Sequence, residues 1–275
     1  MKQTLATLGI ALVLAPDVAH SRDDSAGVAV SYCRNRIQSI QLREVASRQV
    51  ASGAHMQLSE DRTTLCFDGK IDRAQEMAPV RDLERNGSFV MRSPGGHAGT
   101  AMEIANILRE KNAVVVLYDY CFSACANYIL VASGQTYVTK DTIVAWHGGA
   151  SAPDCRYPDA MRIFSEKNNL SMWTEGQKEE FCKVAELQRD FFRTRGIDDA
   201  IAQAPQSHYT RKMLRLSAQL SGYRDRNVFW MWNPKHYRGR FKSAIVYESY
   251  PESQDEVDEI LRRHFFSYAR VIYDP

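Results

Sequence analysis

One segment constrains the fold more than any other: the continuous apolar run Ala113–Tyr118, with the sequence AVVVLY. A β-branched run without alternation is typical of a strand covered on both faces, as the strands of parallel sheets are. Before it, Phe89–Met91 has the composition of a second strand, and Ala98–Lys111 carries apolar residues at helical spacing. The sequence therefore predicts a strand, a helix and a buried strand in succession.

The alternation of strands and helices continues beyond this run. Cys121–Ala132 is predicted as a helix entered directly from the buried strand, and Thr136–Val138 and Ile143–Trp146 as two short strands. A further strand is expected at Thr63–Phe67. Strands that alternate with helices indicate an α/β fold with mostly parallel pairing and right-handed crossovers.

The flanking segments are predicted to be mainly helical. Residues 73–85 are expected to form a helix interrupted or kinked by Pro79, and residues 172–220 are expected to be predominantly helical. A last helix is expected at Gln254–Phe266. The aromatic cluster Phe229–Trp232 is predicted to pack in a core or a subunit contact.

Charge and composition argue against several classes of partner. The 275 residues include 35 Lys and Arg against 33 Asp and Glu, a formal net charge of +2. That balance gives no electrostatic reason to expect a nucleic acid or an anionic membrane as partner. No stretch after the N-terminus approaches the length of a membrane span, and no phosphate-binding loop or H-E-x-x-H motif occurs. We therefore expect no metal, no cofactor and a soluble mature protein.

The N-terminus has the pattern of a secretory signal peptide. Lys2 precedes the apolar run Leu5–Ala15, which is too short to cross a bilayer, and small residues follow it. Cleavage is predicted after Ser21, with Ala19 at the −3 position, so the mature chain is expected in the periplasm or outside the cell. The alternative is a buried N-terminal helix.

The cysteine content fits an exported chain, because an oxidising compartment lets an even number of cysteines pair. Their spacing does not select a connectivity, and it lacks the paired knuckles of a zinc site. Cys121 and Cys125 would share one face of the predicted helix, so each is expected to bridge elsewhere, for example to Cys155 or Cys182. The alternative is buried free thiols. The disulfide candidates are Cys33, Cys66, Cys121, Cys125, Cys155 and Cys182.

Three local features lie where α/β sheets place ligands, beyond the carboxyl ends of strands. The glycines of the loop Ser93–Gly96 (SPGG) let backbone N–H groups face a substrate oxygen. Ser123, at a predicted helix start, is either an N-cap or a nucleophile beside unpaired N–H groups. His147 follows a strand and precedes two glycines, a position that suits a general base.

Together these features resemble the ClpP-type serine proteases of the ClpP/crotonase fold, over residues 65–147. The resemblance runs through Gly69–Asp72 (GKID), which is similar to the family's early G-x-I-D turn, and through the SPGG loop. It continues through Ser123 ahead of a helix and His147, 24 residues later. The CxSAC form around the serine is more similar to an exported branch of the family than to the cytosolic protease. The resemblance implies an α/β fold of repeated β-β-α units with an additional C-terminal segment.

The resemblance also implies a division of the chain and an assembly. Residues 1–21 would be the signal peptide, 22–60 an N-terminal extension, 61–222 the ClpP/crotonase-like domain and 223–275 a C-terminal extension. Proteins with this fold commonly form rings, so a homo-oligomer is implied as well.

Carried over residue by residue, the resemblance implies an exported serine hydrolase, a peptidase acting on peptide or protein substrates. Ser123 would be the nucleophile and His147 the general base. The backbone N–H groups of Gly96 and Ala124 would form the oxyanion hole, and Gly95 would contact the substrate.

The third member of the family's triad is absent from its usual place. The family carries an Asp on a later helix, whereas residues 206–214 contain no acid. Asp198 and Asp199 lie slightly earlier and are the candidates, with Asp190 a weaker one. Because the acid orients the imidazole and does not supply the nucleophile, a dyad without it is also consistent with the residues present.

Two other functions are compatible with the same residues. A non-catalytic ClpP-like protein would keep the cleft to bind peptides or partner subunits, which the missing acid favours. A crotonase-like acyl-thioester enzyme would share the fold and its oxyanion hole, but an exported protein would rarely meet coenzyme A.

Overall fold

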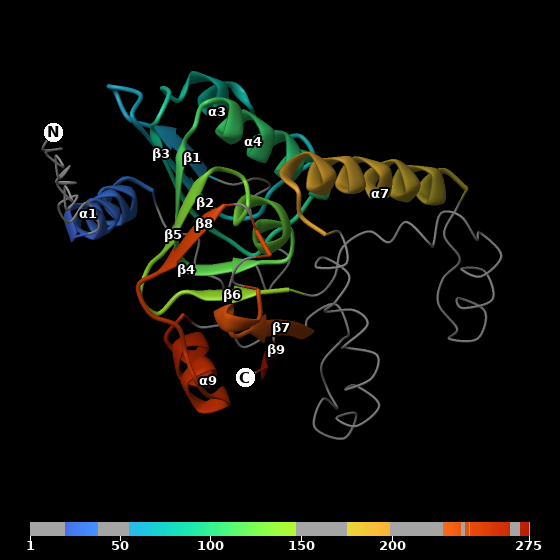
Figure 1. Cartoon of the computed structure of the whole chain (residues 1–275). Helices are drawn as coiled ribbons and strands as arrows, with labels where there is room; N and C mark the ends of the chain where they lie inside the picture. The colour runs from blue at the N-terminus through green and yellow to red at the C-terminus, as the bar shows by residue number, and fades with distance from the viewer. Residues whose placement is uncertain are drawn as a thin grey trace, which may run out of the picture.

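The protein has a mixed α/β structure with a mostly parallel central sheet and helices between the strands, as a computed structural model shows (Figure 1). This confirms the predicted α/β class with mostly parallel pairing. The structure describes residues 20–37, 55–146, 175–198, 228–237, 240–241, 243–264 and 270–274. The sheet has the order β1-β2-β3-β4-β5-β8, with β6 paired to β4 off this path, and only the β1–β2 pair is antiparallel among these strands. Its strands are β1 (His55–Leu58), β2 (Thr64–Asp68), β3 (Ser88–Ser93), β4 (Val114–Phe122), β5 (Gln135–Val138), β6 (Ile143–Ala145) and β8 (Ala244–Tyr247).

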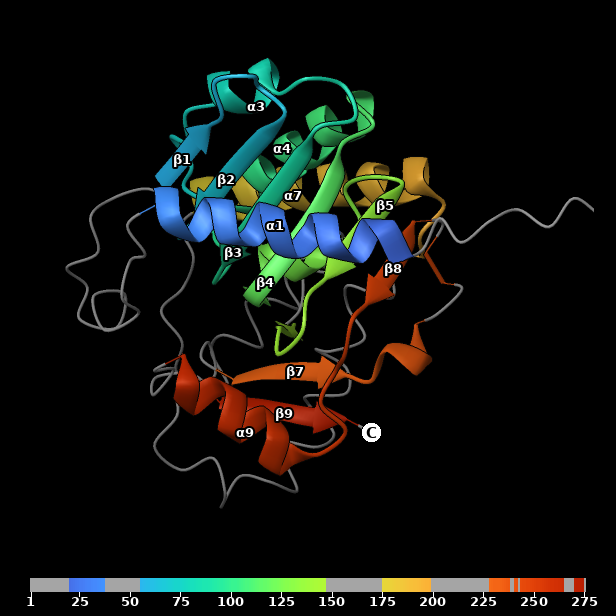
Figure 2. The same ribbon diagram turned by 90° about the vertical axis from the view of Figure 1, so that its left-hand side faces the viewer.

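Helices cover both faces of this sheet. Figure 1 shows α3, α4 and α7 on one side, and Figure 2 shows α1 lying across the other. The helices are α1 (His20–Arg36), α3 (Ala78–Asp82), α4 (Ala98–Glu110), the π-helix η1 (Cys125–Ile129) and α7 (Glu175–Arg195).

The apolar run Ala113–Tyr118 forms the first part of β4, and it is buried on both faces. Val115 and Leu117 belong to the core shared with α3, α4, η1 and α7. Val116 and Tyr118 belong to a second core formed with α1. Successive side chains of a strand point to opposite faces, so a strand between two helical layers needs apolar residues at every position.

The strand β4 has two successive partners, and this makes it longer than predicted. Val114–Leu117 pairs with β5, and Tyr120–Phe122 pairs with β6. Between them, Asp119 adopts a left-handed conformation with φ of 59°. The prediction that a helix begins at Cys121 is therefore wrong, because β6 supplies a partner that keeps this residue in the sheet.

The helix predicted over residues 73–85 is also shorter than expected. Only Ala78–Asp82 is helical, and Pro79 lies in its first turn. Proline suits that position because the first N–H groups of a helix have no acceptor inside it. Pro79 therefore helps to begin the helix, so the predicted interruption or kink at this residue was wrong.

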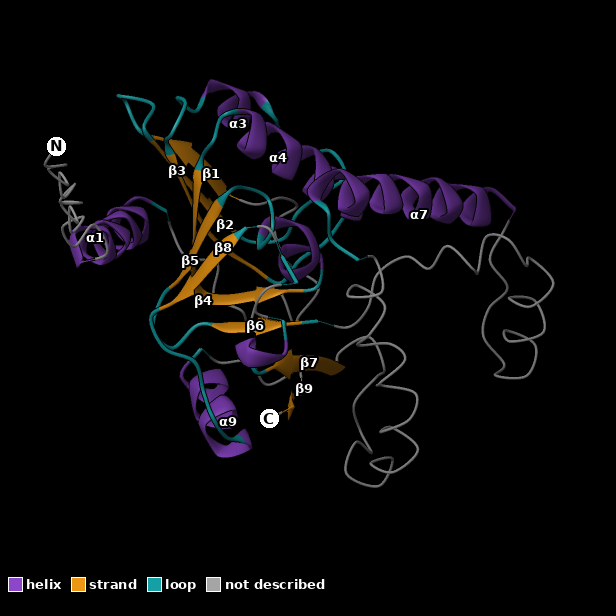
Figure 3. Ribbon diagram, in the orientation of Figure 1, coloured by secondary structure: helices purple, strands orange, loops and turns teal. Residues whose placement is uncertain are grey.

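The C-terminal part adds a small second layer below the sheet (Figure 3). Phe229 and Met231 pack with Phe122, Ile143 and apolar residues of α9. The predicted packing role of the aromatic cluster is thus confirmed. The same part of the chain supplies β8, the edge strand of the large sheet. The elements of this layer are the parallel pair β7 (Val228–Trp232) and β9 (Arg270–Asp274), the short η3 (Pro234–His236) and α9 (Gln254–Arg263).

Among the described residues, every helix is too short or too polar to cross a membrane.

The helix α9 carries a side-chain cap that offers a test of the C-terminal packing. Ser253 Oγ accepts a hydrogen bond from the Glu256 N–H at 3.2 Å. We expect Ser253→Ala to lower the free energy of unfolding by about 1 kcal/mol. Ser253→Asp keeps an acceptor and places a negative charge at the helix N-terminus, so it should preserve stability. Chemical denaturation of both variants measures this, and equal stability of the two would contradict it.

Candidate functional site

The SPGG loop follows β3 directly and is fixed by hydrogen bonds at both ends. Ser93 Oγ accepts from the Gly95 N–H at 3.0 Å. The Ile71 N–H donates to Gly95 O at 2.9 Å, and the His97 N–H donates to Ile71 O at 2.8 Å. The structure therefore brings the segment Gly69–Asp72 alongside the SPGG loop, the first two features of the family resemblance.

Both glycines of the loop are required by their conformation and by close neighbours. Gly95 has φ of 90° and Gly96 has φ of 143°. A Cβ added to Gly95 would lie 2.5 Å from Phe122 O and 2.7 Å from Ser123 Cβ. A Cβ added to Gly96 would overlap the carbonyl oxygen of Ile71. Only glycine lets this loop lie directly against Ser123.

Ser123 occupies a sharp turn between β4 and η1. Its φ is 54°, and its side chain is half-buried. The Ser123 N–H donates to Ala145 O at 3.0 Å, and its carbonyl accepts from the Asn127 N–H at 2.8 Å. Left-handed residues other than glycine are uncommon and occur preferentially at active sites and ligand-binding sites. Ser123 shares this conformation with five other described residues, and it differs from them in lying directly against Gly95 of the SPGG loop.

The turn continues into a π-helix. The Leu130 N–H donates to Cys125 O at 3.1 Å, the wide hydrogen bond of a π-turn. Single π-turns are frequent at functional sites. Thr136 Oγ1 donates to Leu130 O at 2.9 Å, and Tyr128 Oη donates to Gln188 Oε1 of α7 at 2.6 Å. Burial raises the pKa of Tyr128, so this phenol stays a neutral donor.

The two amides expected to form an oxyanion hole lie on this turn and on the SPGG loop. A Cβ added to Gly95 would lie 2.9 Å from the Ala124 nitrogen, so that nitrogen borders the loop. In the turns and loops of the described chain, neither Gly96 N–H nor Ala124 N–H donates a backbone hydrogen bond. Unpaired N–H groups at a helix start can stabilise an oxyanion.

His147 lies outside the described residues, and the strand that leads to it ends beside Ser123. That strand, β6, ends at Ala145, whose carbonyl accepts the Ser123 N–H. Trp146 then exchanges two backbone hydrogen bonds with Trp230, at 2.8 and 2.6 Å. The C-terminal layer thus anchors the residue immediately before His147.

Two of the candidate acids, Asp190 and Asp198, lie in α7 and just after it, and α7 packs against α4. Asp198 follows α7, whose Arg195 Nη2 donates to Ala105 O at 3.2 Å. That contact is about 12 Å along the α4 axis from the end next to the SPGG loop. Asp190 forms an exposed ion pair within α7, and Asp199 lies outside the described residues. The described contacts therefore do not bring Asp190 or Asp198 to the Ser123 turn.

His97 supports the loop and was missed by the sequence analysis. Its Nδ1 accepts from the Thr100 N–H at 3.2 Å and so caps α4. Burial and the nearby charge of Arg73 lower the pKa of His97, which favours the neutral ring that can accept this bond. Its position directly after two glycines and before a helical pattern was the available signal.

The cysteines form disulfides, as predicted, but the expected connectivity was wrong. Cys121 pairs with Cys125, with 2.05 Å between the sulfur atoms, whereas each had been expected to bridge elsewhere. This pairing arises because Cys121 is in the strand, so the two residues lie on either side of a turn. Cys182 is also disulfide-bonded, and Cys155 lies outside the described residues. The remaining pair joins α1 to β2 through Cys33 and Cys66.

The described site therefore consists of a left-handed serine turn and a glycine loop pressed against it, with the Ala124 nitrogen bordering that loop. A scan against models of known protein families finds no match, and a search of curated proteins finds no significant match, so a function is inferred from this geometry and from the resemblance in the sequence.

Proposed function

We propose that this protein is an exported ClpP-like serine hydrolase, a peptidase, with Ser123 as nucleophile and His147 as general base. The observation that carries the proposal is the left-handed turn at Ser123, pressed against Gly95 of the SPGG loop. Such a turn presents a serine hydroxyl at the end of a strand, next to the free N–H groups of the following helix.

The proposed mechanism uses the roles that the family resemblance implies for these residues. His147 takes the proton from Ser123 Oγ as that oxygen bonds to the substrate carbonyl carbon. The N–H groups of Gly96 and Ala124 stabilise the negative charge on the carbonyl oxygen. The carbon–nitrogen bond then breaks, and the amine leaves with the proton from His147. Water then attacks the acyl-enzyme. His147 takes the proton from the water and returns it to Ser123 Oγ as the carboxylic acid leaves. Asp198 and Asp199 are retained as candidates for orienting the imidazole.

Export is supported by the disulfides and by the N-terminal sequence pattern. Two pairs of cysteines, Cys33–Cys66 and Cys121–Cys125, are bonded. Disulfides persist in oxidising compartments such as the periplasm and the extracellular space.

The proposal is tested with a fluorophosphonate probe, which forms a stable adduct with an activated serine. We expect the mature protein to be labelled at Ser123, and Ser123→Ala to abolish the label. Ser133→Ala is the matched control, because Ser133 Oγ is engaged with Gln135 O at 2.8 Å beyond η1, and it should leave labelling intact. Peptide mapping by mass spectrometry locates the adduct.

Two results would contradict the hydrolase proposal. One is folded wild-type protein that takes no label, and the other is a label that persists in Ser123→Ala. The first result would favour the alternative, a ClpP-like protein that binds peptides or subunits without catalysis.

A further inference from the structure

A disulfide brackets the turn that carries Ser123. Cys121 is in the last part of β4 and Cys125 begins η1, with 5.2 Å between their Cα atoms. If β4 continued in an extended conformation, these Cα atoms would be about 13 Å apart. That separation is beyond the reach of a disulfide. The bond therefore requires the chain to reverse within the three residues of which Ser123 is the middle one.

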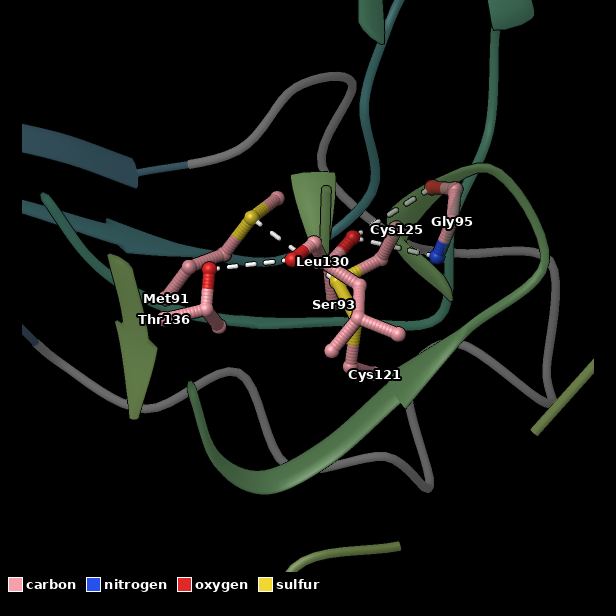
Figure 4. Close-up of a disulfide and its surroundings, with 7 residues drawn as sticks. All are labelled: Met91, Ser93, Gly95, Cys121, Cys125, Leu130 and Thr136. Atoms are coloured by element: carbon pink, nitrogen blue, oxygen red, sulfur yellow. Dashed lines mark hydrogen bonds between the residues drawn. A yellow bond between two sulfur atoms is a disulfide. The ribbon is translucent and has the colours of Figure 1, made fainter. Parts of the chain in front are cut away.

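Both ends of this bond are fixed in the core (Figure 4). Cys121 pairs with Ser93 of β3 and with Val144 of β6, so it is held between two strands. Cys125 Sγ lies 3.9 Å from Met91 Sδ. Both cysteines are fully buried, which closes the sulfur atoms to exchange with thiols in solution and leaves a structural role.

The chain on the far side of the bond is fixed as well. Figure 4 shows Leu130 O accepting from Thr136 Oγ1 of β5, which anchors the end of the π-turn. On the near side, Gly95 lies in contact with the Ser123 turn. The three residues between the cysteines form the loop that the disulfide closes, and the bonds of the Ser123 N–H to Ala145 O and of the Asn127 N–H to Ser123 O lie in the same turn.

We propose that the Cys121–Cys125 disulfide is a positioning device for the nucleophile, an inference that rests on the proposed hydrolase function. It helps to hold Ser123 at its φ of 54°, a conformation that costs energy for a residue with a side chain. Without the bond, Ser123 relaxes to an ordinary φ, and the peptide between Ser123 and Ala124 rotates. The Ala124 N–H then no longer borders the SPGG loop, and the oxyanion loses one donor.

The test compares two variants, each of which lacks one buried disulfide and keeps the other. Cys121→Ala/Cys125→Ala removes the disulfide that brackets Ser123 (the bracket), and Cys33→Ala/Cys66→Ala removes the bond between α1 and β2. We expect the first to lower kinact for the fluorophosphonate about 100-fold, the range for a lost oxyanion donor, with KI unchanged. The second should leave both constants unchanged. A purely structural bond would not separate kinact from KI.

Amide exchange provides a readout that does not depend on catalysis. The Asn127 and Leu130 N–H groups, which bond to Ser123 O and Cys125 O, should exchange faster without the bracket. The Val116 amide in the middle of β4 should not change. Adding Ser123→Gly to the bracket-free variant should restore slow exchange, because glycine adopts positive φ without strain. The same rescue applies if the bracket-free variant fails to fold.

The outcomes separate this inference from the proposed function. Wild-type labelling with an equal kinact in the bracket-free variant overturns the positioning role and leaves the hydrolase proposal standing. Unchanged exchange, or no rescue by Ser123→Gly, overturns it as well. Wild-type protein that takes no label overturns the hydrolase proposal and with it the catalytic purpose of the bond, while the exchange data still decide whether the bond holds the turn.

Discussion

Gly95→Ala is expected to lower fluorophosphonate labelling of Ser123 by at least about 100-fold, the cost of disrupting an oxyanion hole. The new Cβ would lie 2.5 Å from Phe122 O and 2.9 Å from the Ala124 nitrogen, so the loop and the serine turn must move apart. The φ of 90° adds strain for any residue with a side chain. Together these effects should destabilise the fold by about 2–5 kcal/mol.

Gly134→Ala is the matched control for this substitution. Nothing lies within 4 Å of a Cβ at Gly134, which is exposed. Its effect on the free energy of unfolding should be within about 1 kcal/mol, and labelling should be unchanged. Labelling kinetics and chemical denaturation measure both quantities. If Gly95→Ala behaves like Gly134→Ala, the SPGG loop does not contact the nucleophile turn in solution.

The parts of the fold that depend on local pattern were predicted well. The uninterrupted run Ala113–Tyr118 required apolar neighbours on both sides, and α1 and α4 supply them. The helical spacing in Ala98–Lys111 was equally decisive, since α4 ends within one residue of the predicted limit. Periodicity reports burial directly, which explains why these elements needed no tertiary information.

The end of β4 could not be predicted, because its cause lies elsewhere in the chain. Tyr120–Phe122 remains in the sheet because β6 pairs with it and Ser93 of β3 pairs with Cys121, after a left-handed residue at Asp119. The local sequence does not indicate that β6 will pair with this part of β4. The error moved Cys121 from a strand to a helix and so led to the wrong disulfide connectivity.

The candidate site was predictable in part. The sequence resemblance selected Ser123 and the SPGG loop, and the structure brings them into contact. The positive φ of Ser123 and the π-turn after it could not be inferred, since neither has a signature in the local sequence pattern. His147 lies outside the described residues, so its role remains a prediction of the sequence.

A buried ion network on the α1 face of the sheet is expected to stabilise the fold strongly. Arg92 Nε and Nη2 donate to the two carboxylate oxygens of Asp68 at 2.9 and 2.8 Å. Its Nη1 donates to Asp119 Oδ2 at 2.9 Å, and Arg34 of α1 reaches the same carboxylate. The Asp68 side chain is 1% exposed. Arg92→Met would leave two buried carboxylates without their shared cation, at a cost of about 3–5 kcal/mol.

The network also predicts how that cost depends on pH. Desolvation already raises the pKa of Asp68 in the folded protein, although the hydrogen bonds from Arg92 oppose it. Without Arg92 this pKa rises further, so the folded variant binds a proton more readily than the unfolded chain does. Stability of the variant relative to wild type should therefore increase as the pH falls from 7 towards 4. Burial lowers the pKa of His264, which lies near Asp119, and the charge of Arg92 lowers it as well. Loss of Arg92 therefore raises the pKa of His264, which also makes the variant more stable relative to wild type as the pH falls.

An exposed ion pair, Arg81–Glu103, is the control for the buried network. Arg81 Nη2 lies 3.0 Å from Glu103 Oε1, with both side chains more than half exposed, so Arg81→Met should cost only about 0–1 kcal/mol. Adding Asp68→Asn to Arg92→Met removes one uncompensated charge and should recover part of the loss. Denaturation at several pH values tests all three. A cost for Arg92→Met no greater than for Arg81→Met, or one independent of pH, would show that burial of these carboxylates does not depend on their shared arginine.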